Sequence, residues 1–296
     1  MKKVISILLA VVLAFGLCAC GNTKDDPQSD TGSETANSEQ VKQKTSSKGD
    51  VLHDDENAKV VFESIEFVDE GADGSYMYVV LTVENKTNDT LKVSGKDASV
   101  NSFTATVSEY HDIEAKQTDE VEIDFDRECI GNTNIKTLDD VKEIAFVLTL
   151  WNEEFTVDID VPVCLYPHED REYSLVGHEL QEGEQTLIDN ETATVIYKHN
   201  SVNGSMVDIE FYAYNKTDKE LFIALSQVKV GQSPDGALPD YISVLPQKEL
   251  HDTFSIFSDA ETIKSAADIS FVVEFLDTKN YQPIFTTESF TCPITK

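Results

Sequence analysis

The chain has 296 residues, with 55 acidic against 23 basic side chains and a formal net charge of −32 at pH 7. A field of this sign repels nucleic acids, anionic lipid headgroups and anionic wall polymers, so we expect no nucleic-acid partner. It is compatible with cations, basic peptides or neutral glycans as partners, and it also keeps an extracellular protein soluble.

The first residues have the pattern of a secretory signal. Lys2 and Lys3 supply positive charge, and residues 4–15 are apolar apart from Ser6. This run is too short to span a bilayer as a helix, and no other stretch reaches the roughly 18 uninterrupted apolar residues that such a helix needs. The sequence therefore predicts a signal peptide over residues 1–19.

The signal ends in Leu17-Cys18-Ala19-Cys20, which resembles the lipobox of bacterial lipoproteins, although that family more often has Ser, Ala, Thr or Val in the place of Cys18. In that family a peptidase cuts before the cysteine, and the cysteine thiol carries a diacylglyceryl group. The resemblance implies that Cys20 is lipidated and that the protein is extracytoplasmic, anchored to the bacterial cell membrane. An ordinary secretory signal or an uncleaved apolar N-terminus is the alternative. Two acyl chains, at about 0.8 kcal/mol per buried methylene, make a stable anchor.

A polar segment follows the lipobox. Between residues 21 and 50 the only apolar side chains are Ala36 and Val41. Such a segment buries too little apolar surface to offset the entropy of ordering, so we expect residues 20–50 to form a disordered tether. Thirty flexible residues have a root-mean-square reach of about 30 Å.

The rest of the chain repeats itself in three ordered blocks. The paired blocks are LHDDENAKV from Leu52 with LIDNETATV from Leu187, VENKTNDTL from Val83 with AYNKTDKEL from Ala213, and IAFVLTLWN from Ile144 with ISFVVEFLD from Ile269. The offset shrinks along the chain, as expected when loops differ in length between two copies. The sequence thus predicts domains at 51–166 and 185–296, joined by a connection at 167–184.

Both copies alternate apolar and polar residues with the period of strands. The expected inward residues are Met77, Val79, Leu81, Val83, Val121, Ile123, Phe125, Ile144, Phe146, Leu148 and Leu150 in the first copy, and Val207, Ile209, Phe211 and Ala213 in the second. Seven or so short strands in about 110 residues favour an all-β protein of two tandem immunoglobulin-like Greek-key sandwiches. Each Asn-Lys-Thr segment is expected to form a turn between strands.

Two short segments have the pattern of helix N-termini. They are Thr137–Asp140 and Ser258–Glu261, and the second reads as a full capping box. We expect one helical turn in each copy, packed over Leu138, Val141, Ile263 and Ala266.

The order DDENAKV, VENKT, IKTLDDVKEIAFVLTLW resembles a family of bacterial surface-lipoprotein domains of unknown function. These domains are immunoglobulin-like and distantly similar to the mycobacterial immunoprotective antigen sandwich. The resemblance covers both copies, residues 51–296, and implies the same fold with no catalytic or binding residues to carry over. The Cys…Trp…Cys pattern of antibody domains is missing from both copies. The residue of the second copy that aligns with Trp151 is Leu276.

The remaining cysteines, Cys129, Cys164 and Cys292, are odd in number and have no close pair. We expect no disulfide, with the thiols acting as small apolar side chains. Acids at positions 124, 126 and 128 precede Cys129, and negative charge raises a thiol pKa, which argues against a nucleophile.

The sequence contains few residue patterns that are typical of metal-binding sites. His168 and His178 begin HEDRE and HELQE, which lack the second histidine of a zinc-binding H-E-x-x-H motif. Asp69, Glu70 and Asp73 could supply calcium ligands from a loop, but a plain hairpin turn is the preferred interpretation. We expect no catalytic residue, no bound metal and no cofactor.

Outward tyrosines are the remaining lead. Tyr76, Tyr78, Tyr212 and Tyr214 alternate with the inward residues, so they could form a platform for peptide or sugar. The preferred alternative is that they cover sheet surface or meet the neighbouring domain. The sequence as a whole favours a monomeric, non-enzymatic surface protein that binds a protein, peptide or glycan at the cell envelope, and touches the membrane through its anchor. An accessory lipoprotein that binds a small ligand or a cation such as calcium is the alternative.

Overall fold

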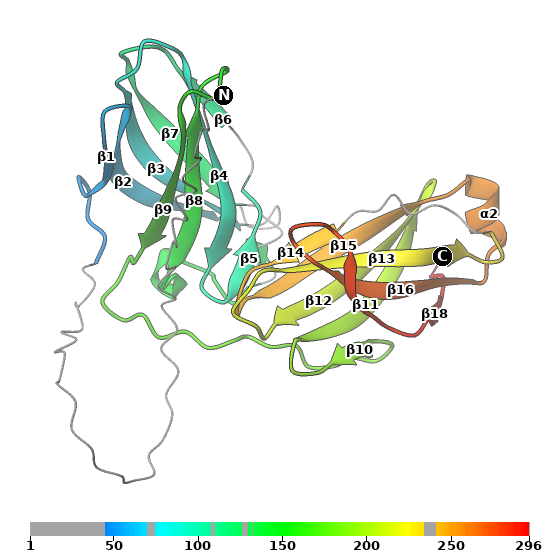
Figure 1. The fold of residues 1–296 in the computed structure, drawn as a ribbon. Helices are drawn as coiled ribbons and strands as arrows, with labels where there is room; N and C mark the ends of the chain where they lie inside the picture. The colour runs from blue at the N-terminus through cyan, green and yellow to red at the C-terminus, as the bar shows by residue number, and fades with distance from the viewer. Residues whose placement is uncertain are drawn as a thin grey trace, which may run out of the picture. The chain divides into compact units, whose positions relative to one another are not determined.

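The computed structural model of the chain divides into two units, residues 1–42 and Gln43–Lys296, of which only the second contains described residues. The structure describes residues 45–69, 75–107, 110–125, 130–131, 133–233 and 241–295, all in the second unit (Figure 1). These residues fold almost entirely into antiparallel strands, so the predicted all-β class is confirmed. The predicted signal peptide, Cys20 and most of the predicted tether lie outside the described residues.

The first copy is a sandwich of two sheets. One sheet has the order β1 (Val51–Asp54), β2 (Ala58–Asp69), β3 (Ser75–Asn85), β7 (Thr118–Phe125). The other has the order β5 (Phe103–Ala105), β4 (Leu91–Val100), β8 (Ile144–Trp151), β9 (Asp158–Leu165), and β6 (Tyr110–Ile113) also pairs with β4. The chain crosses from one sheet to the other between β3 and β4, returns between β6 and β7, and crosses again between β7 and β8, which is the Greek-key pattern of immunoglobulin-like sandwiches.

The second copy repeats this order, except that β5 has no counterpart among the described residues and two short strands take the place of β9. One sheet is β10 (Gln185–Asp189), β11 (Ala193–Asn203), β12 (Met206–Asn215), β15 (Glu249–Phe257). The other is β14 (Tyr241–Val244), β13 (Leu221–Val230), β16 (Asp268–Leu276), with β17 (Pro283–Thr286) and β18 (Phe290–Pro293) both pairing with β16. The chain therefore folds as two tandem sandwiches of one topology.

Each copy has its own hydrophobic core, built from the alternating residues of facing sheets. The inward residues predicted from the sequence are at most 2 % exposed in both copies. In the first core Phe125 meets Phe146 edge to face, with ring centroids 6.0 Å apart. In the second, Phe211 contacts Phe254 and Phe271 in the same manner. Burying each such side chain stabilises the fold by about 1.5–3 kcal/mol.

Even the irregularities of the strands are duplicated. The pairing of β2 shifts between Phe62 and Ser64, and the pairing of β11 shifts between Tyr197 and His199. The pairing of β4 with β8 and that of β13 with β16 shift at the same place, where Asp97 and Gln227 have positive φ angles of 50° and 49°. Bulges bend a strand and increase its twist, so the two copies share their curvature as well as their topology.

The two predicted helical turns are present. A 3-10 turn, η2 (Leu138–Asp140), is held by the Asp140 carboxylate, which accepts from the backbone N–H of Thr137 at 2.9 Å. In the second copy α2 (Ala260–Ser265) is capped by Asp259, which accepts from the Thr262 backbone N–H at 2.8 Å. The cap is thus Asp259 rather than the Ser258 expected from the capping-box pattern. Val141, Ile263 and Ala266 are buried as expected, and Leu138 is partly buried.

The ordered part of the first copy begins before the predicted end of the tether. The backbone N–H of Ser46 donates to the carbonyl of Tyr166 at 2.9 Å, and the Ser46 hydroxyl accepts from the Tyr166 N–H at 3.0 Å. The Gly49 N–H donates to the carbonyl of Phe62 at 2.8 Å. These bonds use backbone groups and one hydroxyl, so a segment poor in apolar side chains is ordered here. Residues 45–50 therefore belong with the sandwich.

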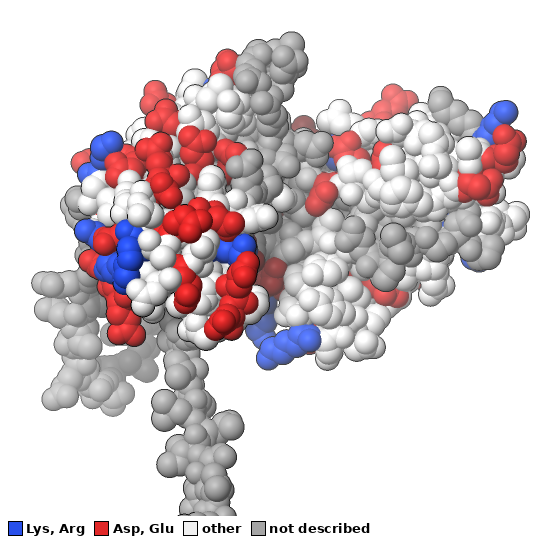
Figure 2. All heavy atoms as spheres, turned by 90° about the horizontal axis from the view of Figure 1, so that it is seen from above, with Lys and Arg blue, Asp and Glu red and all other residues white. Residues whose placement is uncertain are grey.

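Acidic side chains are spread over the surface. Figure 2 shows Asp and Glu distributed across the face that it presents, with fewer Lys and Arg between them. Among the residues that the structure describes, none of the helices has the length and apolarity required to cross a membrane.

Candidate functional site

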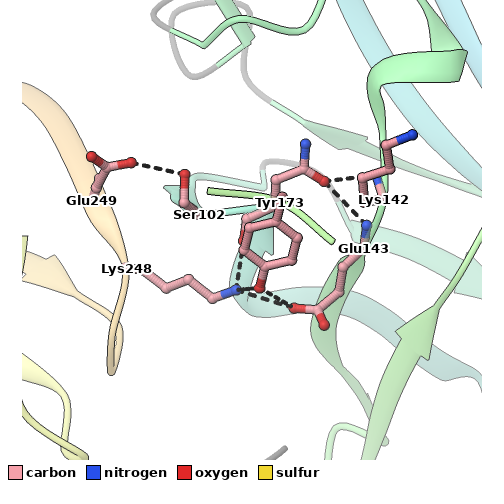
Figure 3. Close-up of polar contacts among 7 residues, drawn as sticks. Ser102, Lys142, Glu143, Tyr173, Lys248 and Glu249 are labelled. Atoms are coloured by element: carbon pink, nitrogen blue, oxygen red, sulfur yellow. Dashed lines mark hydrogen bonds and ion pairs between the residues drawn. The ribbon is translucent and has the colours of Figure 1, made fainter. Parts of the chain in front are cut away.

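The strongest candidate site lies where the start of β15 in the second copy meets the first copy. Its centre is Glu249, which is fully buried. The Glu249 carboxylate accepts from the Ser102 hydroxyl at 2.8 Å (Figure 3) and, through the same oxygen, from the Val176 N–H at 3.0 Å. Its other oxygen accepts from the Tyr212 hydroxyl at 2.9 Å and from the Gly177 N–H. A buried carboxylate is tolerated only when hydrogen bonds replace its water. Glu249 thus joins the first copy, the connection and the second copy.

The backbone joins the copies at the same point. The Glu249 N–H donates to the Ser102 carbonyl at 2.7 Å, and Glu249 pairs in parallel with Phe103. Through this one pair, β15 and β5 become neighbours, so one strand order runs through both copies.

Lys248 makes a second cluster beside it. Its ammonium donates to the Glu143 carboxylate at 3.1 Å, the Tyr173 hydroxyl at 3.0 Å and the Asn101 carbonyl, and the Tyr173 hydroxyl donates to Glu143 at 3.1 Å (Figure 3). Burial acts against the charge on Lys248, but Tyr173 and Glu143 outweigh it and raise the Lys248 pKa. Burial is also the main cause that raises the Tyr173 pKa. The lysine therefore stays charged at the junction.

His251 completes the junction with a ring stack. Its ring lies 5.8 Å from that of Phe103 at an interplanar angle of 18°, and 5.8 Å from that of His178 in the connection. Burial, followed by the positive charge of Lys198 and by His178, lowers the His251 pKa to about 4, although Glu210 and Glu184 act in the opposite direction. His251 is therefore neutral at pH 7, which suits a ring packed between two copies.

A hollow of about 540 Å³ borders this junction. Thr104 and Leu245, which both line it, are joined by a 3.1 Å hydrogen bond from the Leu245 N–H to the Thr104 hydroxyl. The first copy contributes residues of β4 and β5, and the second contributes residues of β13, β14 and β15. A second hollow of about 350 Å³ lies between the first copy and residues 172–176 of the connection.

Aromatic rings form one wall of the larger hollow. Phe222 and Tyr241 are stacked at 4.4 Å, and Tyr281, which is half exposed, lies 5.8 Å and 5.4 Å from their rings. In the first copy Lys92 and Tyr110 occupy the places of Phe222 and Tyr241 in the strand pairing, and the Lys92 ammonium lies 5.6 Å from the Tyr110 ring centroid. The aromatic wall is thus a property of the second copy.

The four predicted outward tyrosines divide into different roles. Tyr212 is 4 % exposed, its hydroxyl donates to Glu249, and its ring stacks on that of His178 in the connection at 5.3 Å, so the platform hypothesis is wrong for Tyr212. Burial and the charge of Glu249 raise the Tyr212 pKa. The Tyr214 hydroxyl donates to Gln247. Tyr76 and Tyr78 stack on each other at 6.2 Å on the first copy.

The residues considered for metal chemistry are placed apart. His168 binds the carbonyl of Leu138, and His178 binds the Glu184 carboxylate at 2.7 Å. Among described residues, no three His, Cys, Asp or Glu side chains are arranged to hold a metal ion. Asp69 ends β2, whereas Glu70 and Asp73 lie outside the described residues.

The cysteines also differ from one another. Cys164 is exposed on β9, and Cys292 is buried in the second core. Burial raises the pKa of the Cys292 thiol. Cys20 and Cys129 lie outside the described residues.

The junction residues were missed in the sequence, although the repeat contains a signal for them. The Asn85 N–H donates to the carbonyl of Gln117, and the Asn215 N–H donates to that of Lys248, so Gln117 and Lys248 occupy equivalent places. By the same register Thr118 stands where Glu249 does. This position holds an exposed threonine in the first copy and a buried carboxylate in the second. The difference indicates that the position has a role in the second copy that it lacks in the first.

Comparisons with known proteins add no identity. No family model and no curated protein matches the chain. Among solved structures, it is similar to red sea bream transglutaminase (11 % identity, TM-score 0.24), covering 80 % of this chain but only 31 % of the transglutaminase. It is similar to a protein of unknown function from Porphyromonas gingivalis W83 (14 %, TM-score 0.23; 80 % and 97 % covered). It is also similar to the Salmonella enterica SafA pilin in complex with the SafB chaperone (13 %, TM-score 0.20; 78 % and 96 % covered).

Proposed function

We propose that this chain is a lipid-anchored, extracytoplasmic, non-enzymatic binding protein whose two sandwiches work as one unit. The observation that carries the proposal is the buried carboxylate of Glu249, which receives hydrogen bonds from Ser102, Tyr212 and the connection. A fully desolvated charge held by donors from both copies links their folding and their placement. The described polar clusters at this junction are engaged in holding the copies together.

A joined pair offers a surface that neither copy has alone. The larger hollow takes one wall from each copy, and its aromatic residues come from the second copy only. Concave sites of several hundred cubic ångströms with a few polar groups are where ligands commonly bind. The junction supports the proposal because it holds the two walls of this hollow together.

The anchor is the other half of the proposal. Cys20 at the end of an apolar run supports lipidation there, and the polar residues that follow would separate the sandwiches from the membrane. Mass spectrometry of the native protein should find a diacylglyceryl group on Cys20, and Cys20→Ser should release the protein from cells. A native protein with an unmodified Cys20 thiol would end the anchoring proposal.

The binding role is tested on intact cells that carry the full-length protein. A photo-crosslinking residue in place of Ser243, which lines the larger hollow, should give a defined adduct, and the same residue in place of the exposed Glu288 should not. The Ser243 adduct should be lost in Glu249→Ala if the two copies act together. An adduct that survives Glu249→Ala unchanged would show that the copies work independently.

A further inference from the structure

Open strand edges surround the larger hollow. β15 and β5 meet at one residue pair, Glu249 with Phe103. Elsewhere in the described residues β15 pairs with β12, and β5 pairs with β4. β14 pairs with β13 on one side only, again within the part of the chain that the structure describes. Backbone N–H and C=O groups on an open edge are available to pair with another strand.

The hollow is acidic. Asp97, Glu220 and Asp252 line it, and the one cationic side chain among its lining residues, Lys96, forms a 2.8 Å ion pair with Asp160. The charge of the hollow therefore complements a cationic occupant, as does the net charge of −32 of the whole chain.

Asp252 is the most informative of these acids. It pairs with Phe211 across the strands, on the face of β15 that points to the core. Val121, which pairs with Leu81 at the equivalent place in the first copy, is fully buried in the core. Desolvating a charge costs free energy, so a carboxylate in the place of a core valine indicates a position that is open to solvent. Asp252 is indeed only half buried, and its carboxylate accepts from the Thr253 N–H at 2.7 Å. The second copy thus places an anionic group at the side of its sandwich, where the hollow opens.

The aromatic wall suits the same kind of occupant. Phe222 and Tyr241 face the hollow, and aromatic faces attract ammonium and guanidinium groups as well as apolar side chains. Ser243 lies on β14 beside them. An occupant that alternates basic and apolar side chains would match both the acids and the rings.

We propose that this hollow binds an extended, basic polypeptide segment that adds a strand along β14, with a lysine or arginine beside Asp252. In strand addition, backbone hydrogen bonds give affinity, and pockets for alternate side chains give specificity. The proposal deepens the proposed function, since it names the partner class of the same site. A neutral glycan would use the aromatic wall, but it would offer neither the backbone groups that pair with a strand edge nor a positive charge that attracts the carboxylates.

The test uses the full-length protein in detergent and an eight-residue peptide of alternating valine and lysine. The peptide should bind saturably, more weakly as salt rises, and it should slow hydrogen exchange of the β14 amides by about tenfold or more. Replacing its valines by prolines, or its lysines by glutamates, should abolish binding. Cellohexaose serves as the neutral-glycan probe and should not bind.

Variants locate the site. Asp252→Val introduces the residue of the first copy, and we expect it to fold and to weaken peptide binding about tenfold or more. Asp252→Asn keeps the shape of the side chain but removes its charge, and it should weaken binding by a similar factor. If one of these two variants fails to fold, the other still tests the proposal. Glu288→Gln removes one exposed charge elsewhere and should change affinity less than twofold.

Three outcomes would overturn the proposal. They are peptide binding that Asp252→Val leaves unchanged, binding without protection of β14, and cellohexaose binding in place of the peptide. A crosslinked adduct at Ser243 on cells combined with any of them would retain the binding role and reject only the basic strand as its partner.

Discussion

Asn85 in the first copy and Asn215 in the second make the same set of hydrogen bonds, and both are fully buried. The Asn85 amide donates to the carbonyls of Asp89, Ile113 and Glu114 at 2.8, 2.9 and 3.2 Å. The Asn215 amide donates to the carbonyls of Lys219, Val244 and Leu245 at 2.7, 2.9 and 3.2 Å. Each asparagine therefore ties the turn after it to a strand of the opposite sheet.

This relationship predicts that both asparagines are needed for stability. We expect Asn85→Ala and Asn215→Ala to lower the free energy of unfolding by about 2–4 kcal/mol each, because buried carbonyls lose their donor. Asn85→Asp should cost a similar amount, since a carboxylate cannot donate. Urea denaturation followed by circular dichroism measures the loss. The exposed Asn203 is the control, and Asn203→Ala should change stability by no more than about 0.5 kcal/mol.

The sequence predicted the sandwiches because their signal is local. Alternation from Met77 to Val83 identifies a strand and its inward face without reference to any other segment, and the structure confirms it. The same local view treated the Asn-Lys-Thr segments as turns, and the turns are present. It could not show that Asn85 reaches Ile113, because that contact depends on the packing of one sheet over another.

The contacts at the junction between the two copies could not be predicted from the sequence for a related reason. Ser102 and Glu249 are far apart in the chain, and no pattern near either residue specifies the other. Tyr212 was expected on an outer face, which is where its strand places it, yet it is buried against Glu249 and against His178 of the connection. Contacts between domains depend on how two finished folds meet, so periodicity within each fold says nothing of them. The available signal for the junction was the difference between the two copies at equivalent positions, such as Thr118 and Glu249.

The two described cysteines are predicted to differ in reactivity. Iodoacetamide should label Cys164 at least about tenfold faster than Cys292, because the first is exposed, whereas burial raises the pKa of the second and limits access. Site-resolved mass spectrometry after timed labelling measures both rates. In 8 M urea the two rates should converge. Equal labelling of the native protein would contradict the burial of Cys292.

Breaking the junction should separate the two copies while leaving each one folded. Glu249→Ala leaves the N–H groups of Val176 and Gly177 and two hydroxyls without their acceptor, and we expect it to cost about 3 kcal/mol. Small-angle scattering should show a larger radius of gyration, with an unchanged strand content by circular dichroism. Thr118→Ala, at the equivalent place in the first copy, is the matched control and should alter neither quantity. A Glu249→Ala protein with the original radius would show that other contacts hold the copies.

The half-buried ring of His251 predicts that acid weakens the same junction. Its pKa in the folded protein is about 4, below the ordinary 6.5, so the unfolded chain takes up a proton at a higher pH than the folded protein does. The contribution of His251 to stability is therefore complete above about pH 6.5, declines as the pH falls towards 4, and is lost below it. Allowing for partial solvent access, we expect it to amount to about 2 kcal/mol.

Urea denaturation at a series of pH values tests this expectation. His251→Gln should flatten the stability profile between pH 6.5 and 4, because the group that takes up the proton on unfolding is gone. His199→Gln, which alters an exposed histidine on β11, should retain the slope of the unmodified protein. Since His251 stacks on Phe103, the scattering radius should also grow as the pH falls towards 4 in the unmodified protein. A pH profile that His251→Gln leaves unchanged would assign the acid sensitivity to other groups, and a constant radius would show that protonation of His251 leaves the junction closed.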